Sequence, residues 1–338
     1  MKHYDPWQNL LNKIENSGGF VNAHAHFDRA YTVTEQNLRD VVYDHLHNKW
    51  LFVDQYKEAA TLNDYCKNIQ TALFDQRGMG TSACLSFIDV DSVVGLKALR
   101  AAGLAKDYAK GIGVEFKIAT QTLKGVISPY ERIYLDMALD TGLVDIIGSL
   151  PGVDKGLEGS HLDIIFELAK RYNKRVHVHV DQLNCPTEKE TELLARKTME
   201  HGYEDKVTAI HSISLAAQPK YYRSEVYKMA SDAGLSFITC PTAWIDSRRT
   251  EVLSPTHNAI TPVDELIEHD LTVAIGSDNI HDVYKPYSTG DMSTELKFLL
   301  EAVHLYDPEV LVKIATENGR KVMGIDVIGN RVSGEDKR

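Results

Sequence analysis

Eight short apolar runs, rich in β-branched residues, alternate with longer helical segments along this chain of 338 residues. Near-continuous apolar strands separated by helices are typical of a parallel sheet that helices cover. Eight such units predict an α/β fold, a (β/α)8 TIM-like barrel. A doubly wound open sheet is the alternative, but no glycine-rich phosphate-binding pattern follows the first run. The runs are residues 19–24, 82–90, 113–120, 143–150, 174–180, 206–211, 235–240 and 271–276.

The barrel predicted from these runs spans residues 19–325, with an N-terminal extension at 1–18 and a C-terminal tail at 326–338. The first crossover, residues 30–80, is longer than one helix needs and predicts two helices. Its polar and aromatic stretch at 40–60 predicts a surface or interface element rather than a catalytic one.

Charge and cysteine content exclude several classes of protein. The net charge of −11 argues against a nucleic-acid or anionic-membrane surface. No stretch approaches the roughly 18 apolar residues of a membrane span, and the polar start lacks a signal peptide's apolar core. The four cysteines are scattered and form no C-x-x-C pair, so a reducing cytoplasm is the expected compartment.

Polar residues gather where the predicted strands end. His24 and His26 close the first run, His179 the fifth and His211 the sixth, and Asp278 follows the eighth. Residues i and i+2 of a strand point to the same side, and barrel enzymes keep their active sites at the carboxyl ends of the strands. Histidine nitrogens and one carboxylate suit a catalytic divalent ion with an open water position, zinc or iron first.

Each of these residues also has a structural explanation when it is considered alone. His177 and His179 alternate along one strand, so either could be a core histidine. His211 alone favours a structural role, and Asp278 alone could equally cap a helix. Four histidines and one aspartate at the ends of the first, fifth, sixth and eighth runs together favour the metal site.

Several motifs in the chain resemble those of the amidohydrolase superfamily, and its cytosine deaminase-like branch is the closer match. The resemblance runs from Gly19 to Gly324 and implies the metal-dependent hydrolase barrel. Any one motif is weak, but the set is specific because order and spacing agree. The motifs are "HAHFDRA", "FIDVDSVVGLKAL", "IATQ", "DIIGSLPG", "HVHVDQ", "TCPTAW", "GSDNIHDVYKPYSTGDM" and "ATENGRKVMG".

The resemblance assigns roles to individual residues. It implies that His24, His26, His179 and Asp278 ligate one divalent ion, with His211 beside it as a catalytic and substrate-contacting residue. Gln121 resembles the family glutamine that hydrogen-bonds the substrate, and Asn279 is placed in the same substrate-binding set. Binuclear relatives carry a bridging lysine on strand four, which this chain lacks; Lys117, on strand three, is expected to be structural.

Gln182 departs from the family pattern at a catalytic position. The deaminases carry a glutamate three residues after the strand-five histidine, and that glutamate shuttles protons to the substrate ring. A glutamine amide cannot accept and return a proton near neutral pH, so efficient ring deamination is put in doubt. Asp181 is adjacent, but the alternation of the strand turns it differently from Gln182.

The ends of the chain are the second departure. Family members usually carry a small β-sandwich built from both termini, which is expected to be absent or vestigial here. The barrel surface that a sandwich would cover is compatible with a homo-oligomer.

The expected reaction is hydrolysis of a non-peptide carbon–nitrogen bond in a small nitrogenous substrate, a cyclic amide or an amino-substituted heterocycle. A metal-bound hydroxide would attack with Asp278 as the base, while His211 stabilises the oxyanion. Three alternatives stay open. They are a cytosine- or pyrimidine-type deaminase despite Gln182, a catalytically degenerate ligand-binding barrel, and a phosphoester or lactone hydrolase, which would prefer two metals.

Overall fold

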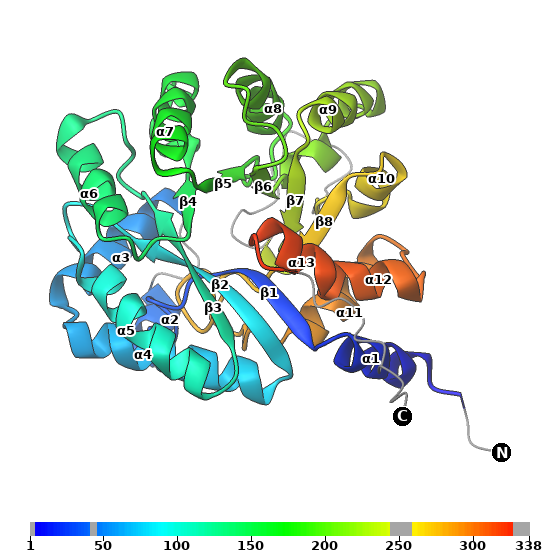
Figure 1. The fold of residues 1–338 in the computed structure, drawn as a ribbon, viewed down its shortest axis with the longest axis horizontal. Helices are drawn as coiled ribbons and strands as arrows, with labels where there is room; N and C mark the ends of the chain where they lie inside the picture. The colour runs from blue at the N-terminus through cyan, green and yellow to red at the C-terminus, as the bar shows by residue number, and fades with distance from the viewer. Residues whose placement is uncertain (1–3, 41–45, 244–258, 327–338) are drawn as a thin grey trace, which may run out of the picture.

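The computed structural model describes residues 4–40, 46–243 and 259–326. Its eight strands are all parallel and follow one another around a single sheet in chain order. The helices lie outside this sheet, so the architecture is the predicted (β/α)8 barrel (Figure 1). The strands are β1 (Phe20–Ala25), β2 (Thr81–Asp89), β3 (Glu115–Gln121), β4 (Ile146–Ser149), β5 (Arg175–Val180), β6 (Val207–His211), β7 (Ser236–Thr239) and β8 (Thr272–Ile275).

The first and last strands meet at the carboxyl end of the barrel. Ala25 and Asp278 form a parallel bridge, and the Asp278 N–H donates to the His24 carbonyl at 2.9 Å. The loops that follow β1 and β8 therefore lie together. The "HAHFDRA" motif near the start of the barrel thus lies next to the "GSDNIHD" motif near its end.

The first crossover contains three helices where the sequence predicted two. The break between the second and third is set by Thr61, whose side chain accepts from the Asp64 N–H in a capping box. The helices of the described chain are α1 (Pro6–Asn16), α2 (Glu35–Asp40), α3 (Leu46–Ala59), α4 (Leu62–Gly78), α5 (Lys97–Gly111), α6 (Pro129–Asp140), α7 (Glu158–Tyr172), α8 (Glu190–Glu200), α9 (Lys220–Asp232), α10 (Val263–Glu268), α11 (Met292–Ala302), α12 (Pro308–Ala315) and α13 (Glu317–Val322), with short 3-10 turns η1 (Pro151–Val153) and η2 (Ile213–Ala217).

Helix α13 closes the amino end of the barrel. Its Val322, with Met323 just after it, packs on apolar side chains inside the barrel, among them Val21, Phe87 and Ile146. His177 lies fully buried there and its Nε2 is 2.9 Å from the Val322 carbonyl, which makes it a core histidine. The interior is thus filled at this end, and space for a ligand remains at the carboxyl end.

The N-terminal extension forms α1, which contacts α12 and buries Leu10 and Ile14. The predicted tail at 326–338 lies outside the described residues except for Asp326. Across the described ranges, no helix is both long enough and apolar enough to cross a membrane.

Candidate active site

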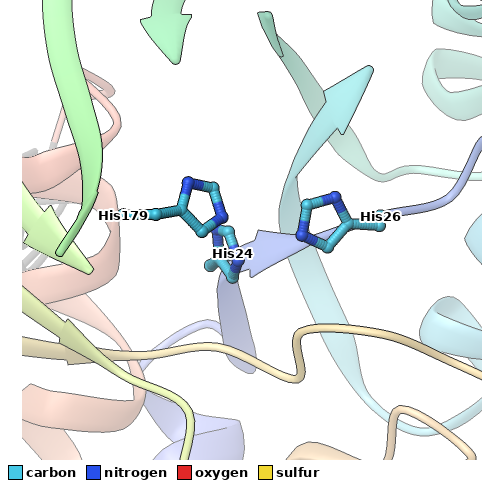
Figure 2. A group of neighbouring side chains, drawn as sticks. All are labelled: His24, His26 and His179. Atoms are coloured by element: carbon cyan, nitrogen blue, oxygen red, sulfur yellow. The ribbon is translucent and has the colours of Figure 1, made fainter. Parts of the chain in front are cut away.

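Four histidines and one aspartate converge at the carboxyl end of the barrel. One group of possible ligand atoms comes from His24, His26 and His179, and a second from His24, His211 and Asp278; within each, all atoms lie within 4.8 Å of one another. Figure 2 shows the first group, with two rings from β1 and its end facing the ring from β5. The structure therefore brings together all five residues that the strand-end pattern singled out.

The nitrogens of this cluster have few partners within the protein. His24 has two ring nitrogens without a hydrogen bond, and His26, His179 and His211 have one each, although all four residues are almost fully buried. The Asp278 Oδ1 lies 3.3 Å from the Nε2 of His24 and 3.2 Å from that of His26. Buried polar atoms are normally hydrogen-bonded. Unpartnered nitrogens beside a carboxylate are the donor set of a metal ion such as zinc, so these residues fit one.

Burial sets the protonation states that a metal needs. It lowers the pKa of His24, and it lowers those of His26 and His179 well below the usual histidine value, so the three rings are neutral. Burial also lowers the pKa of His211 to about 4. Burial alone would raise the pKa of Asp278, but the neighbouring His24 and His26 hold it well below its usual range. Neutral imidazoles and an ionised carboxylate are the ligand forms.

Contacts with neighbouring residues outside the cluster orient these side chains. The His179 Nδ1 lies 3.2 Å from the Ser149 carbonyl at the end of β4, which leaves Nε2 for the cluster. The ring of Phe87 from β2 lies under His24 and His179, with centroid separations of 4.6 and 4.9 Å. His211 and Asp278 have positive φ angles of 72° and 59°, a strained backbone typical of functional sites.

Buried polar contacts fix the loop that carries Asp278. The Ser277 N–H donates to the Asn22 side chain at 3.0 Å, and the Asn22 amide donates back to the Ser277 hydroxyl at 2.8 Å. The fully buried Lys285 ammonium donates to the Ser277 carbonyl and pairs with Glu295. Strand β1 and the β8 loop are thus joined through Asn22 and Ser277, and Lys285 ties this loop to α11.

A pocket opens above the histidines, and the predicted substrate-binding residues line it. Gln121 at the end of β3 is buried and its Oε1 has no hydrogen-bond partner. The Asn279 amide donates to Asp282, which fixes the side chain at the wall. Gln182 also lines this pocket, whereas Asp181 points elsewhere and accepts from the N–H groups of Glu190 and Thr191. The lining residues are His26, Arg29, Trp50, Gln121, Leu123, Leu150, His179, Gln182, His211, Asp278, Asn279 and Tyr284.

The stretch 40–60 is closer to the site than its sequence predicted, and this expectation was wrong in part. Residues 41–45 lie outside the described chain, but Trp50 of α3 lines the pocket. Lys57, two turns further on, is buried and pairs with Asp91 at 2.6 Å and Asp89 at 3.0 Å. The helix therefore covers the pocket and is held there by ion pairs at the end of β2.

Arg29 is a second pocket residue that the sequence reasoning missed. Its guanidinium is buried, donates to Asp89 at 3.1 Å and lies 5.3 Å from the Tyr284 ring centroid. Its Nε has no hydrogen-bond partner and stands 3.8 Å from Asp282. The signal was present, since Arg29 is part of "HAHFDRA" just after the two histidines. Lys117, in contrast, lies 28% exposed beside Asp145, away from the lining residues.

Comparison with known proteins places the chain in a family. The model of the amidohydrolase family matches residues 18–330. An uncharacterized protein of Haemophilus influenzae is 42% identical over 267 residues, which are 76% of this chain and 94% of that protein. The N-isopropylammelide isopropyl amidohydrolase of a Pseudomonas species is 28% identical over 321 residues, 92% of this chain and 75% of that protein.

The fold has a solved counterpart as well. The crystal structure of 5-methylcytosine deaminase from Klebsiella pneumoniae, liganded with 5-fluorocytosine, matches with a TM-score of 0.83 at 24% identity. The match covers 90% of this chain and 74% of the deaminase. The chain therefore belongs to the amidohydrolase family, and it is a hydrolase of carbon–nitrogen bonds other than peptide bonds.

Proposed function

We propose that the enzyme uses one divalent metal ion, zinc or iron, to hydrolyse the bond between a heterocyclic ring carbon and a nitrogen substituent. The observation that carries this proposal is the set of buried, unpartnered histidine nitrogens beside the Asp278 carboxylate at the floor of the pocket. His24, His26, His179 and Asp278 would hold the ion, and His211 stands next to them. When bound, such an ion lowers the pKa of a coordinated water toward about 7, so a nucleophile is available at neutral pH.

Asp278 and His211 handle the charges of the reaction. Asp278 is ionised in its buried setting and takes one proton from the attacking water as the water oxygen bonds to the ring carbon. It returns this proton to the nitrogen as the carbon–nitrogen bond breaks. The products are a hydroxyl-substituted ring, which becomes the oxo form when the second water proton moves to a ring nitrogen, and a free amine or ammonia. His211 lies beside Asp278, where it can hydrogen-bond the attacking oxygen as that oxygen bonds to the carbon and the displaced electron pair moves onto the ring.

The upper pocket suits a ring that carries oxygen substituents. Arg29 and Asn279 offer N–H donors, and Gln121 offers both a donor and an unpartnered acceptor oxygen. Trp50, Leu123 and Leu150 supply apolar walls that pack on a flat ring and exclude water. The similarity to a hydrolase named for N-isopropylammelide supports a substituted nitrogen heterocycle as the substrate class.

Gln182 narrows the chemistry further. A glutamine can position a ring nitrogen by hydrogen bonding but cannot protonate it, so the ring must not depend on an external acid. A cyclic amide or an oxo-substituted ring with an amino or alkylamino substituent meets this condition, because its carbonyl groups already draw electron density from the carbon that is attacked. The proposal therefore favours such rings over cytosine itself.

Metal content and amine release test the proposal together. Purified protein should contain about one equivalent of zinc or iron by elemental analysis, and it should release ammonia or an alkylamine from a panel of amino- and alkylamino-substituted oxo-heterocycles. Asp278→Asn should keep the circular dichroism spectrum of the folded protein and lose turnover by at least about 10²-fold, the lower range for general acid–base help. Absence of metal after reconstitution, or normal turnover in Asp278→Asn, would contradict the assignment.

A further inference from the structure

A buried hydrogen-bonded relay of three side chains starts at the end of β4, the strand that pairs with β5. The Ser149 Oγ is 2.7 Å from the Nε2 of His161, and the His161 Nδ1 is 2.6 Å from the Oδ2 of Asp154. Ser149 ends β4, Asp154 follows η1, and His161 lies in the first turns of α7. With Asp154 ionised, His161 donates a hydrogen bond from Nδ1 to Asp154, and its Nε2 accepts a hydrogen bond from the Ser149 hydroxyl.

This Ser–His–Asp order resembles a nucleophilic triad, but its surroundings exclude that role. Ser149 and His161 are both 0% exposed, and neither is among the residues that line the pocket. A serine nucleophile has to reach a substrate carbonyl, which this hydroxyl cannot do. The relay therefore acts on its neighbours and not on a substrate.

The nearest such neighbour is a proposed metal ligand. The backbone carbonyl of Ser149 accepts from the Nδ1 of His179 at 3.2 Å, and this contact aims Nε2 at the cluster. The relay holds the side chain of the same residue. The rotation of the His179 ring thus depends on where Ser149 places its carbonyl, and Ser149 is fixed from behind by His161.

Strand β4 needs this support because its ladder is thin on one side. It pairs with β5 from Ile146 to Ser149, but its pairing with β3 is limited to Ala119 and Ile146. Beyond that point the Thr120 hydroxyl bonds both the N–H and the carbonyl of Gly148, at 3.0 and 3.1 Å. Side chains, rather than a backbone ladder, fix the end of β4 on its β3 side.

Asp154 extends the relay to the pocket wall. Its Oδ2 accepts from the N–H groups of Val126 and Ile127, at 2.8 and 3.3 Å. Gly125 packs so closely that a Cβ there would lie 2.3 Å from Asp154 Oδ1. The loop that these contacts hold follows Gln121 and carries Leu123, and both of these residues line the pocket.

We propose that Ser149, His161 and Asp154 form a positioning relay that sets the affinity and geometry of the metal site through the Ser149 carbonyl and His179. This inference rests on the proposed function, because it takes His179 as a ligand. Groups that orient a ligating histidine typically change metal affinity by about 10- to 100-fold when they are removed.

The test measures zinc binding rather than turnover. Metal-free full-length protein and its Ser149→Ala and His161→Gln variants are titrated with zinc against a chromophoric chelator, and the melting temperature of each metal-free protein is recorded. We expect both variants to bind zinc about 10- to 100-fold more weakly. Cobalt(II) loaded into the same proteins should show an altered visible spectrum in the variants, because the absorption of this ion follows its coordination geometry.

His201→Gln is the matched control. His201 also bonds an aspartate, Asp163 on α7, at 2.9 Å, but it lies outside the lining residues and the ligand cluster. This variant should bind zinc like the wild type. If Ser149→Ala and His161→Gln bind zinc as tightly as the wild type and give the same cobalt spectrum, the relay is overturned but the proposed function is not. The relay is also overturned if zinc binding weakens only because the metal-free variants no longer fold, as their melting temperatures would show. A wild-type protein that takes up neither ion would overturn the proposed function and the relay with it.

Discussion

Gly276 shows how closely a single residue constrains the site. It follows β8, and a Cβ at this position would lie 2.7 Å from the Cβ of His24 and 2.8 Å from its carbonyl oxygen. Neither atom is the end of a flexible side chain, so β1 or β8 would have to shift. A glycine is therefore what allows the last strand to approach the strand that carries His24.

Gly276→Ala should weaken zinc binding by at least tenfold and lower the melting temperature, because the extra methyl group displaces His24. Isothermal titration of the metal-free protein and a thermal scan measure both effects. Gly78→Ala serves as the control, since a Cβ at Gly78 meets nothing within 4 Å. Unchanged zinc binding in Gly276→Ala would show that His24 tolerates displacement.

Gln182 is the residue at which the proposed substrate class can be challenged. Gln182→Glu supplies a proton shuttle of similar size in the pocket wall, and we expect it to raise kcat/KM for cytosine-like rings by about 10²-fold or more. Ammonia release from cytosine and from an alkylamino-substituted oxo-heterocycle, measured side by side, checks this. If cytosine hydrolysis stays undetectable, the pocket differs from a cytosine site in more than this proton.

At the residue scale, the sequence predicted the cluster because the four histidines and the aspartate stand at strand ends. In a parallel barrel the carboxyl ends of all strands lie on one face, so these side chains meet. Gln121 and Asn279 were placed by resemblance, and the structure locates both in the pocket wall. Arg29 stands in the "HAHFDRA" motif, but its pairing with Asp89 could not be predicted in this way, and neither could the Ser149 relay. Their partners come from β2, from α7 and from the residue that follows η1, and no spacing along the chain reports those contacts.

At the element scale, α3 is the part of the barrel that departs most from a plain crossover. Trp50 and Lys57 are two turns apart and share a face, so the ion pairs of Lys57 hold the tryptophan over the pocket. Asp54, on the same helix, pairs with Lys124 of the β3 loop. The helix is thus attached to two strand ends at once.

Lys57→Met should destabilise the protein by about 3 kcal/mol, because Asp89 and Asp91 lose a buried partner. It should also raise KM more than it lowers kcat, since under the proposed function Trp50, which lines the pocket, would contact the ring and not the reacting atoms. Chemical unfolding and steady-state kinetics measure the two effects. Asp54→Asn provides a milder variant that keeps the buried pairs, and Lys67→Met, at an exposed lysine of α4, is the control.

The eight strands were predictable because short runs rich in β-branched and other apolar residues alternate with helical segments, and all eight appear at their expected places. The three helices of the first crossover were not recognised, although Thr61 and Asp64 carry the capping-box spacing that separates α3 from α4. The polar and aromatic stretch that includes α3 predicts a surface or interface element. Lys57 is instead buried by an ion network that only the assembled barrel provides.

At the scale of the whole molecule, buried acids and buried histidines give stability opposite dependences on pH. Burial raises the pKa of Glu188 to about 7 and that of Glu190 to about 8, so the folded state keeps protons that the unfolded chain releases near pH 4.5. Burial lowers the pKa of His177 to about 3 and that of His211 to about 4. Below pH 6.5 the unfolded chain binds protons at these histidines that the folded state does not bind. Their contribution to the free energy of unfolding therefore rises with pH up to about 6.5 and is constant above it.

Between pH 6.5 and 8, Glu188 and Glu190 lose their protons in the folded state, whereas both are already ionised in the unfolded chain. Their titration should lower the free energy of unfolding of the metal-free protein by about 2 kcal/mol. Urea unfolding at several pH values measures this. Glu190→Gln should flatten the decline of the unfolding free energy with pH, whereas the control Glu204→Gln, at an exposed position, should leave this decline unchanged. A flat profile in the wild type would mean that these acids are ionised in the folded protein.

The bridge between Ala25 and Asp278 has a consequence for the order of events in synthesis. The donors of the proposed metal site come from β1, β5 and the loop after β8, so a growing chain lacks the carboxylate until nearly the whole barrel has been translated. Nascent chains that end before β8 would bind the ion with histidines only. Full metal affinity would then arise at the moment of barrel closure, and release of bound metal would be an early sign that the barrel has begun to open.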